Sequence, residues 1–393
     1  MRHAPYRPSV PPVVLLSALS MIAAALAAGS TRGQNERDRL PSVRPVARRA
    51  SETSVTALVA GAHVLHASAG RQSKPGSVSI SFVGDTMLGD TPDLPPKPGH
   101  YLDNVRTSLG NAQIVFGNLE GTLTTSTSSK CGTNPSPNCF DFRVPPRYAG
   151  YLRHDGFDVL NSANNHAHDF GAKGVSQTSA ALRDAGIRQT GLPGQIAVVG
   201  TGETTVAFVG FAPYSNTCNL LDLGAAKTLI HKADDRADLV VVYMHAGAEG
   251  AGKTHVTGRE EYAYGEDRGN PKVFAHMAVT NGADLVLASG PHVLRGIEFY
   301  RHRLIAYSLA NFASWHNFGT DGIVGLSGIL HVTVGPKGWF GSGHLVSVRL
   351  NDDGRPIHDY SRESAHLVRS LSNEDFGSRA ARVADDGTIT APA

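Results

Sequence analysis

The sequence predicts an α/β fold built on a mostly parallel, layered sheet. Seven apolar runs each end in a polar residue or a small-residue turn, and helical patterns lie between several of them. Alternation of strands and helices is typical of parallel sheets covered by helices. With 393 residues, the chain has room for one large or two ordinary domains and a sizeable core.

The apolar runs give the strands in order. The first, "SVSISFVGD", alternates apolar and polar residues and stops at Asp85. The second, "AQIVFGNLEG", stops at Asn118 and Glu120, and the third, "FDVLNSANNH", stops at a cluster of asparagine and histidine. The later runs are "TTVAFVGFAPY", "DLVVVYMHAG", "GADLVLASGPH" and "RLIAYSLANF". Polar residues are therefore expected to gather at the carboxyl edge of the sheet, where such folds bind ligands.

Helices and a hairpin are predicted between and after these strands. Residues 172–185 have a helical pattern that ends at Gly186, and glycine is favoured just after a helix end. An Asn-Pro pair opens a second helix over 270–281, because Asn caps helices well and Pro suits the first helical position. Residues 323–350 have the pattern of a β-hairpin, and residues 351–393 read as a polar tail that packs poorly.

The N-terminal residues 1–30 have the pattern of an export signal. Arg2 and Arg7 precede an apolar stretch at 13–27, and small residues follow it. The stretch is short and rich in alanine, which favours a cleaved signal peptide over an uncleaved anchor. Residues 31–76 lack periodicity and read as a linker or a loosely ordered arm. We therefore expect an exported, extracytoplasmic protein that is either secreted or held by its N-terminal segment.

The net charge and the histidine content indicate which kinds of partner the chain can bind. The formal net charge is +2 and no basic stripe is visible, so the sequence gives no support for a nucleic-acid partner. The chain contains 18 histidines, and histidine is the commonest metal ligand and acid–base residue.

Cys131 and Cys139 bracket a loop rich in Pro, Asn and Ser. An exported chain can oxidise such a pair, so a disulfide is predicted. A zinc knuckle is the alternative, although no CxxC motif or nearby histidine pair accompanies it. Cys218 is then left over and is expected to be a buried thiol.

Ligand-type side chains stand at five of the predicted strand ends. They are Asp85, Glu120, Asn164, Asn165, His166, Asp169, His245, Glu249 and His292. Carboxylate, amide oxygen and imidazole without thiolate suit hard or borderline divalent ions such as Zn²⁺, Mn²⁺, Fe²⁺ or Mg²⁺. One such residue alone is more often structural, but the series predicts a site for one or two divalent ions.

The motif series resembles a known family. "SFVGDTMLGD", "GNLEGTLT", "NSANNHAHDFG", "YMHAGAEG" and "SGPHVLRGIEFYRHRLIAYSLANF" are similar, in this order, to the motifs of the CapA family of poly-γ-glutamate capsule biosynthesis proteins. That family resembles a branch of the calcineurin-like metallophosphoesterases. The resemblance implies a layered αββα sandwich of metallophosphoesterase type over residues 77–350, with metal ligands on loops at one edge.

The resemblance also implies residue roles. Asp85 would bind the first metal ion, Glu120 would take the place of the bridging carboxylate, and Asn165 would be an amide-oxygen ligand. His245 and His292 would be imidazole ligands. His166 would be the general acid or a transition-state stabiliser.

The sequence allows two roles for Asp169. It suits a partner that fixes the tautomer of His166. A helix N-cap for the segment that follows is the equal alternative.

The sequence departs from the family pattern at several positions of the site, which weakens the metal site. Met87 stands where the phosphoesterase pattern has a histidine, and the final motif has Gly290 where the family usually has a histidine. Ala310 replaces a usual glycine, and Glu120 is one methylene longer than the usual aspartate.

Two functions follow from these residues. The first is a metal-dependent hydrolase acting on a phosphoester or on a polyglutamate-type amide, within capsule, poly-γ-glutamate or related envelope polymer biosynthesis. The second is a non-catalytic binding or assembly module for an anionic envelope polymer, with a degenerate metal site. Either could work with membrane-associated biosynthesis machinery.

Overall fold

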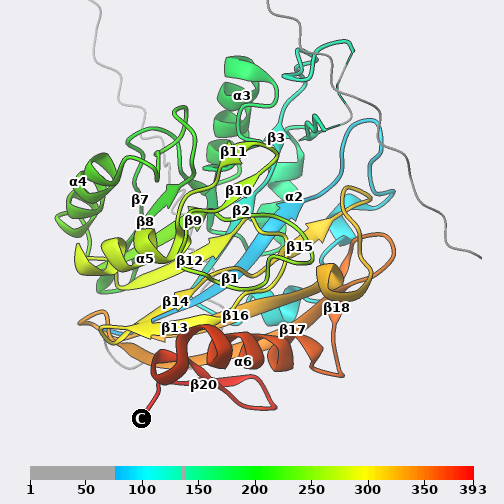
Figure 1. The fold of residues 1–393 in the computed structure, drawn as a ribbon. Helices are drawn as coiled ribbons and strands as arrows, with labels where there is room; N and C mark the ends of the chain where they lie inside the picture. The colour runs from blue at the N-terminus through cyan, green and yellow to red at the C-terminus, as the bar shows by residue number, and fades with distance from the viewer. Residues whose placement is uncertain (1–75, 135, 137) are drawn as a thin grey trace, which may run out of the picture. The chain divides into compact units, whose positions relative to one another are not determined.

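The computed structural model describes residues 76–393 except residues 135 and 137. The expected signal peptide (1–30) and the expected arm (31–76), apart from Gly76, lie outside the described residues. Two large sheets dominate the described part of the chain (Figure 1).

The larger sheet has ten strands around the long first strand. Its strands in spatial order are β19 (Arg382–Val383), β20 (Thr388–Thr390), β17 (Phe340–Leu350), β16 (Leu326–Val334), β1 (Val78–Met87), β2 (Ile114–Leu119), β5 (Val159–Asn161) and β6 (Arg188–Thr190). In addition, β15 (Asn311–Ser314) pairs with β1 and β18 (Pro356–His358) pairs with β17. The segment β1–β2–β5–β6 is parallel throughout, whereas β16 and β17 form an antiparallel hairpin beside β1.

The smaller sheet has six strands. Its order is β13 (Ile297–Tyr300), β14 (Arg303–Ala306), β12 (Leu285–Ser289), β9 (Leu239–His245), β8 (Thr204–Phe211) and β7 (Ala197–Thr201). The inner strands β14, β12, β9 and β8 are parallel, and the two edge strands are antiparallel to their neighbours. Two short ribbons complete the strands: β3 (Thr122–Leu123) with β4 (Arg143–Val144), and β10 (Tyr262–Ala263) with β11 (Glu266–Asp267).

Six α-helices accompany the sheets in the described residues. They are α1 (Arg106–Leu109), α2 (Tyr148–His154), α3 (Gly171–Asp184), α4 (Leu223–Asp234), α5 (Pro271–Thr280) and α6 (Glu363–Phe376). Short 3₁₀ turns lie at Pro98–His100, Gly322–Gly325 and Gly377–Arg379. The Asn270 side chain caps α5 by accepting a hydrogen bond of 3.1 Å from the Val273 N–H, as the Asn-Pro pair predicts.

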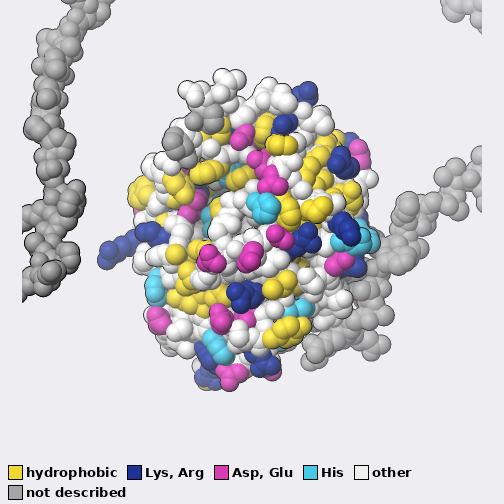
Figure 2. Space-filling view, turned by 90° about the vertical axis from the view of Figure 1, so that its right-hand side faces the viewer, with side chains coloured by type: hydrophobic (Ala, Val, Ile, Leu, Met, Phe, Trp, Pro, Cys, Tyr) yellow, Lys and Arg dark blue, Asp and Glu magenta, His cyan; other side chains and the backbone are white. Residues whose placement is uncertain are grey.

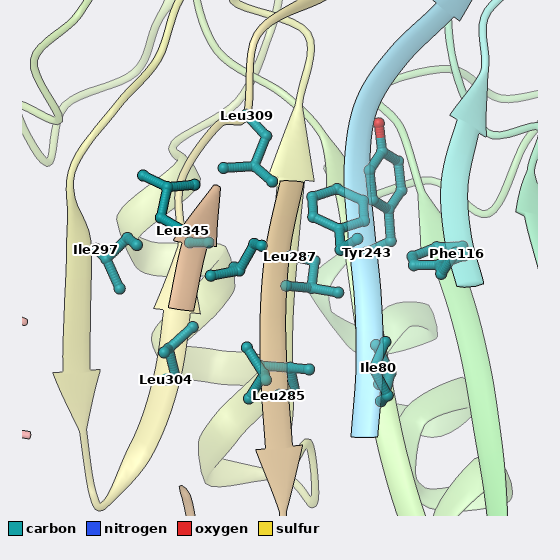
Figure 3. Packing of buried hydrophobic residues seen from close by; sticks show 14 of the residues in the cluster. Ile80, Phe116, Tyr243, Leu285, Leu287, Ile297, Leu304, Leu309 and Leu345 are labelled. Atoms are coloured by element: carbon teal, nitrogen blue, oxygen red, sulfur yellow. The ribbon is translucent and has the colours of Figure 1, made fainter. Parts of the chain in front are cut away.

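The two sheets pack face to face through their inner apolar side chains. The ring centroid of Phe116 in the larger sheet lies 5.0 Å from that of Phe208 and 5.7 Å from that of Tyr243 in the smaller sheet. Figure 3 shows Phe116 and Tyr243 among the side chains of this core. A second cluster joins the outer face of the smaller sheet to α4 and α5, for example through Phe274. A third joins the outer face of the larger sheet to α2 and α3, for example through Leu182. The four layers form the αββα sandwich that the sequence resemblance implies.

The segment 351–393 differs from its predicted form. We expected a poorly packed polar tail, but it contributes β18, α6, β19 and β20. Val368 of α6 and Ile389 of β20 are buried in the core between the sheets. The sequence signal is weak because α6 is amphipathic, so its few apolar residues face inward among many polar ones.

Cys131 and Cys139 are joined in a disulfide, as predicted from their spacing. Cys218 is free and buried. Among the described helices, none combines the length and the apolar character needed to cross a membrane.

Thiol reactivity should follow this arrangement. In protein from an oxidising compartment, only Cys218 should react with a thiol reagent after unfolding, and burial should protect it in the native state. Mass spectrometry of the alkylated chain should find one label without reductant and three with it. Three labels without reductant would contradict the disulfide.

Candidate metal centre

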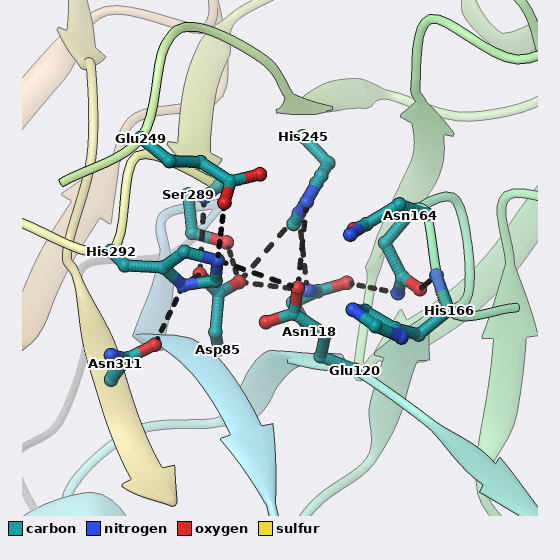
Figure 4. Close-up of polar contacts among 12 residues, drawn as sticks. Asp85, Asn118, Glu120, Asn164, His166, His245, Glu249, Ser289, His292 and Asn311 are labelled. Carbon is teal, nitrogen blue, oxygen red and sulfur yellow. Dashed lines mark hydrogen bonds and ion pairs between the residues drawn. The ribbon is translucent and has the colours of Figure 1, made fainter. Parts of the chain in front are cut away.

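The candidate site lies where the carboxyl ends of parallel strands from both sheets meet. In the larger sheet Asp85 of β1 is in register with Asn118 of β2, which is in register with Asn161 of β5. In the smaller sheet His245 ends β9 and pairs with Ser289 at the end of β12. Figure 4 shows the side chains from these ends pointing toward one another. This edge is where α/β sheets place ligands.

Asp85, Glu120 and His245 form the centre of the group. One ligand atom from each lies within 4.8 Å of the others, and all three residues are buried. His245 Nδ1 is 3.7 Å from Asp85 Oδ1, and His245 Nε2 is 3.6 Å from Glu120 Oε1. The trio combines two carboxylates with one imidazole, a donor set that suits a divalent ion.

His292 lies on the border of this trio. Its Nδ1 is 3.3 Å from Asp85 Oδ2, and its Nε2 is 3.8 Å from Glu120 Oε1. Nδ1 also lies 2.8 Å from the side-chain oxygen of Asn311. An amide oxygen can only accept, so Nδ1 carries a hydrogen and Nε2 of the neutral ring is left to face Glu120.

Several buried polar atoms of the predicted ligands lack hydrogen-bond partners. Within the described part of the chain, these include both carboxylate oxygens of Glu120, Nε2 of His245 and the side-chain oxygen of Asn165. Leaving such atoms buried and unsatisfied costs about 1–3 kcal/mol each, and more for a charged group. The Glu120 oxygens are electron-pair donors within the converging trio of Asp85, Glu120 and His245, so these residues fit a bound cation.

Burial and charge shift the pKa values of the central groups. Burial, together with the neighbouring Asp85 carboxylate, raises the pKa of Glu120 well above its usual range. Burial would lower the pKa of His292, but the carboxylates of Glu120 and Asp85 raise it to about 10. Burial lowers the pKa of His245 to about 3. Without a cation, burial and the neighbouring charges thus favour a proton on the Glu120–His292 pair, and a metal ion would displace it.

Metal affinity should therefore rise with pH. Each proton that the ion displaces from Glu120 or His292 should strengthen binding by about tenfold per pH unit below the relevant pKa. Titrating Mn²⁺ into the protein between pH 6 and 8, in buffers of different ionisation enthalpy, should reveal proton release. Affinity that is flat across this range would contradict displacement of these protons.

His166 and Asp169 form a buried pair beside the centre. His166 Nδ1 lies 2.8 Å from Asp169 Oδ2, and burial lowers the pKa of the imidazole against the raising effect of that carboxylate. A carboxylate only accepts, so Nδ1 donates and Nε2 is free for proton exchange. The N-cap position of α3 is Phe170, and no side chain accepts a hydrogen bond from the first turn of this helix. Asp169 is therefore not the N-cap of α3.

Gly290 adopts a backbone conformation that lets its N–H bind Asp85. Its φ is +112°, and an added Cβ would lie 3.1 Å from the Ala246 nitrogen and 3.2 Å from the His245 ring. Its N–H donates a 3.1 Å hydrogen bond to Asp85 Oδ2, and the Ser289 hydroxyl donates to Asp85 Oδ1. In this chain, the segment Ser289–Gly290 thus supplies two hydrogen-bond donors to Asp85, whereas the family pattern has a metal-binding histidine at position 290. A histidine at 290 would be strained and would press on His245.

The sequence analysis did not predict that Asn118 and Asn161 help to hold the site. Asn118 donates a 2.8 Å bond to Asp85 Oδ1, and its own side-chain oxygen accepts from Asn161 at 2.6 Å and Asn164 at 3.0 Å. Asn118 did mark a predicted strand end, which was the available signal. Glu249 also reaches the centre: Oε2 lies 3.8 Å from His292 Nε2, while Arg268 binds Oε1 at 2.7 Å.

The chain is similar to curated capsule proteins. It is 27% identical to the PGA biosynthesis protein CapA of Bacillus subtilis (strain 168) over 266 residues, which are 60% of this chain and 63% of that protein. It is also 27% identical to the capsule biosynthesis protein CapA of Bacillus anthracis, over 60% of this chain and 59% of that protein. The match thus spans less than two thirds of the length of either relative.

Among solved structures, the chain is similar to a 5′-nucleotidase precursor from Thermus thermophilus. The TM-score is 0.40 at 12% identity, over 76% of this chain and 59% of that chain. The family model described as bacterial capsule synthesis protein PGA_cap matches residues 79–315, which include every predicted ligand. The chain therefore belongs to the PGA_cap family of bacterial capsule synthesis proteins.

Proposed function

We propose that this chain is an exported hydrolase of envelope polymer biosynthesis, and that it acts at a divalent metal site. Asp85, Glu120, Asn165, His245 and His292 would hold one or two ions, and the substrate would be a phosphoester or a polyglutamate-type amide. The observation that carries the proposal is the convergence of Asp85, Glu120 and His245, in which both Glu120 oxygens are buried without hydrogen-bond partners.

The chain's own residues can position and protonate a substrate. A divalent ion held here would polarise a phosphoryl or acyl oxygen and lower the pKa of a bound water. Asn118, Ser289 and the Gly290 N–H hold the Asp85 carboxylate in a fixed orientation. His166 would exchange a proton with the leaving group through Nε2, while Asp169 holds Nδ1.

A binding or assembly module is the second candidate. Asp85 already accepts hydrogen bonds from three donors, and Gly290 adds no ligand, so the site could be degenerate. Acidic and basic side chains are interspersed on the face that Figure 2 shows, without a wide basic area. On that face, an anionic polymer would not find an extended positive surface, which favours a metal ion as the counter-charge.

A paired assay tests the proposal. The purified chain, treated with chelator and reloaded with Mn²⁺ or Zn²⁺, is incubated with bis(p-nitrophenyl) phosphate and, separately, with poly-γ-glutamate. Metal-dependent release of nitrophenol or of shortened polymer, lost again with chelator, supports the hydrolase. Bound metal without cleavage of either substrate supports the binding module.

Export is a separate proposal. We expect the mature chain to lack about its first 28–30 residues, because a basic start, an apolar stretch and small residues precede that point. Mass spectrometry of secreted and membrane fractions should find the new N-terminus. Recovery of only intact cytosolic chain beginning at Met1 would contradict export.

A further inference from the structure

The two flanks of the Cys131–Cys139 disulfide loop both reach the His166–Asp169 pair. Lys130 directly precedes Cys131, and Phe142 follows Cys139 by three residues. Neither residue was among the predicted site residues.

Lys130 contacts the pair from one flank. Its Nζ lies 2.6 Å from Asp169 Oδ1 and donates a 3.1 Å hydrogen bond to the Asn165 carbonyl. Its backbone N–H also donates to the Asp169 carbonyl at 2.7 Å. Asp169 is fully buried, and a buried carboxylate is strongly disfavoured without a cation or several donors. Lys130 therefore places an opposite charge beside Asp169 Oδ1, while Oδ2 accepts the hydrogen bond from His166.

Phe142 contacts the pair from the other flank. Its N–H donates a 2.7 Å hydrogen bond to Asp169 Oδ2, the oxygen that also receives His166 Nδ1. Its ring lies against the His166 imidazole, with centroids 4.4 Å apart. Both oxygens of Asp169 and one face of His166 are thus fixed by residues beside the disulfide.

The pairing of β3 with β4 closes the base of this loop, and the Thr122 N–H donates to the Phe142 carbonyl at 3.0 Å. Lys130 is further out, on a stretch without a strand partner. The disulfide ties that stretch back to the chain just before Phe142. Without the bond, the contacts of Lys130 and the hydrogen bond from Arg143 to the Ser126 carbonyl would have to hold this stretch near Asp169, against the entropy of a longer free loop.

We infer that Lys130 is a positioning residue for His166 through Asp169, and that the Cys131–Cys139 disulfide maintains this arrangement. The inference rests on the proposed function where turnover is measured, because it assigns proton exchange to His166. Partners that orient an active-site histidine typically change activity or affinity by about 10–100-fold. Lys130 should therefore affect kcat far more than KM.

Three variants and one control test the inference. Lys130→Met removes the charge at similar length, Lys130→Arg restores a cation, and Cys131→Ser with Cys139→Ser removes the disulfide. Lys173→Met, at an exposed lysine on α3, is the matched control. We expect kcat to fall about 10–100-fold in Lys130→Met and in the double serine variant, with KM and Tm little changed in Lys130→Met. Lys130→Arg should recover much of the loss.

A second readout does not need turnover. In the proton NMR spectrum, the His166 Nδ1–H should give a downfield, slowly exchanging resonance, assigned by its loss in His166→Ala. This resonance should be present in the wild type and Lys173→Met, and broadened or lost in Lys130→Met and the double serine variant. If the wild type shows the resonance but cleaves no substrate, the proposed function fails while the positioning role stands. An unchanged resonance and unchanged kcat in Lys130→Met would overturn the inference.

Discussion

Replacing His166 by alanine should reduce metal-dependent turnover by about 10²–10⁴-fold, the usual contribution of a positioned proton donor. Metal affinity should change little, because His166 Nδ1 is bound to Asp169 and the ring is not one of the proposed ligands. The measurement is kcat on bis(p-nitrophenyl) phosphate beside a calorimetric Kd for Mn²⁺.

His168→Ala is the matched control for this loss. His168 lies two positions away in the same loop, and its Nε2 contacts the Asn216 carbonyl at 3.1 Å. We expect this variant to keep wild-type kcat. If His166→Ala also keeps wild-type kcat, the proposed proton exchange by His166 is wrong, and another group must protonate the leaving group.

The change Glu120→Gln should remove metal binding. Both carboxylate oxygens of Glu120 are buried without hydrogen-bond partners, and the neutral amide would supply no charge to neutralise a cation. Mutating a residue that only hydrogen-bonds a metal ligand typically lowers metal affinity about 10–100-fold, and the loss in Glu120→Gln should be larger. Equilibrium dialysis with Zn²⁺ or Mn²⁺, followed by elemental analysis, measures it.

Glu203→Gln is the control for that variant, because Glu203 is exposed in the turn between β7 and β8. Asp85→Asn should give a loss like that of Glu120→Gln. If Glu120→Gln retains metal at the wild-type level, the bound ion lies elsewhere in the chain, and the strand-end residues serve only to satisfy one another.

The strand ends could be predicted because they depend on the order of apolar and polar residues along a short stretch of chain. An apolar run that stops at a carboxylate or imidazole marks a buried strand entering a polar edge, and Asp85, Glu120 and His245 follow this rule. Parallel order brings Asp85 and Glu120 together within the larger sheet, whereas their approach to His245 depends on the packing of the two sheets against each other.

Other parts depend on contacts between residues that are distant in sequence. The bond between Asn118 and Asp85, and the reach of Lys130 to Asp169, leave no periodic signal in the chain. Gly290 was read as a lost ligand, whereas its backbone conformation lets its N–H reach Asp85. The segment 351–393 looked like a tail because only the inward face of α6 is apolar.

Calorimetric titration of Mn²⁺ and Zn²⁺ into chelator-treated wild-type protein at pH 7.5 tests the central claim most directly. The account predicts saturable binding of at least one ion per chain, with release of protons and with no binding in Glu120→Gln. Absence of binding by the folded wild type to both ions would contradict the metal centre, and would leave only the sandwich fold and the family.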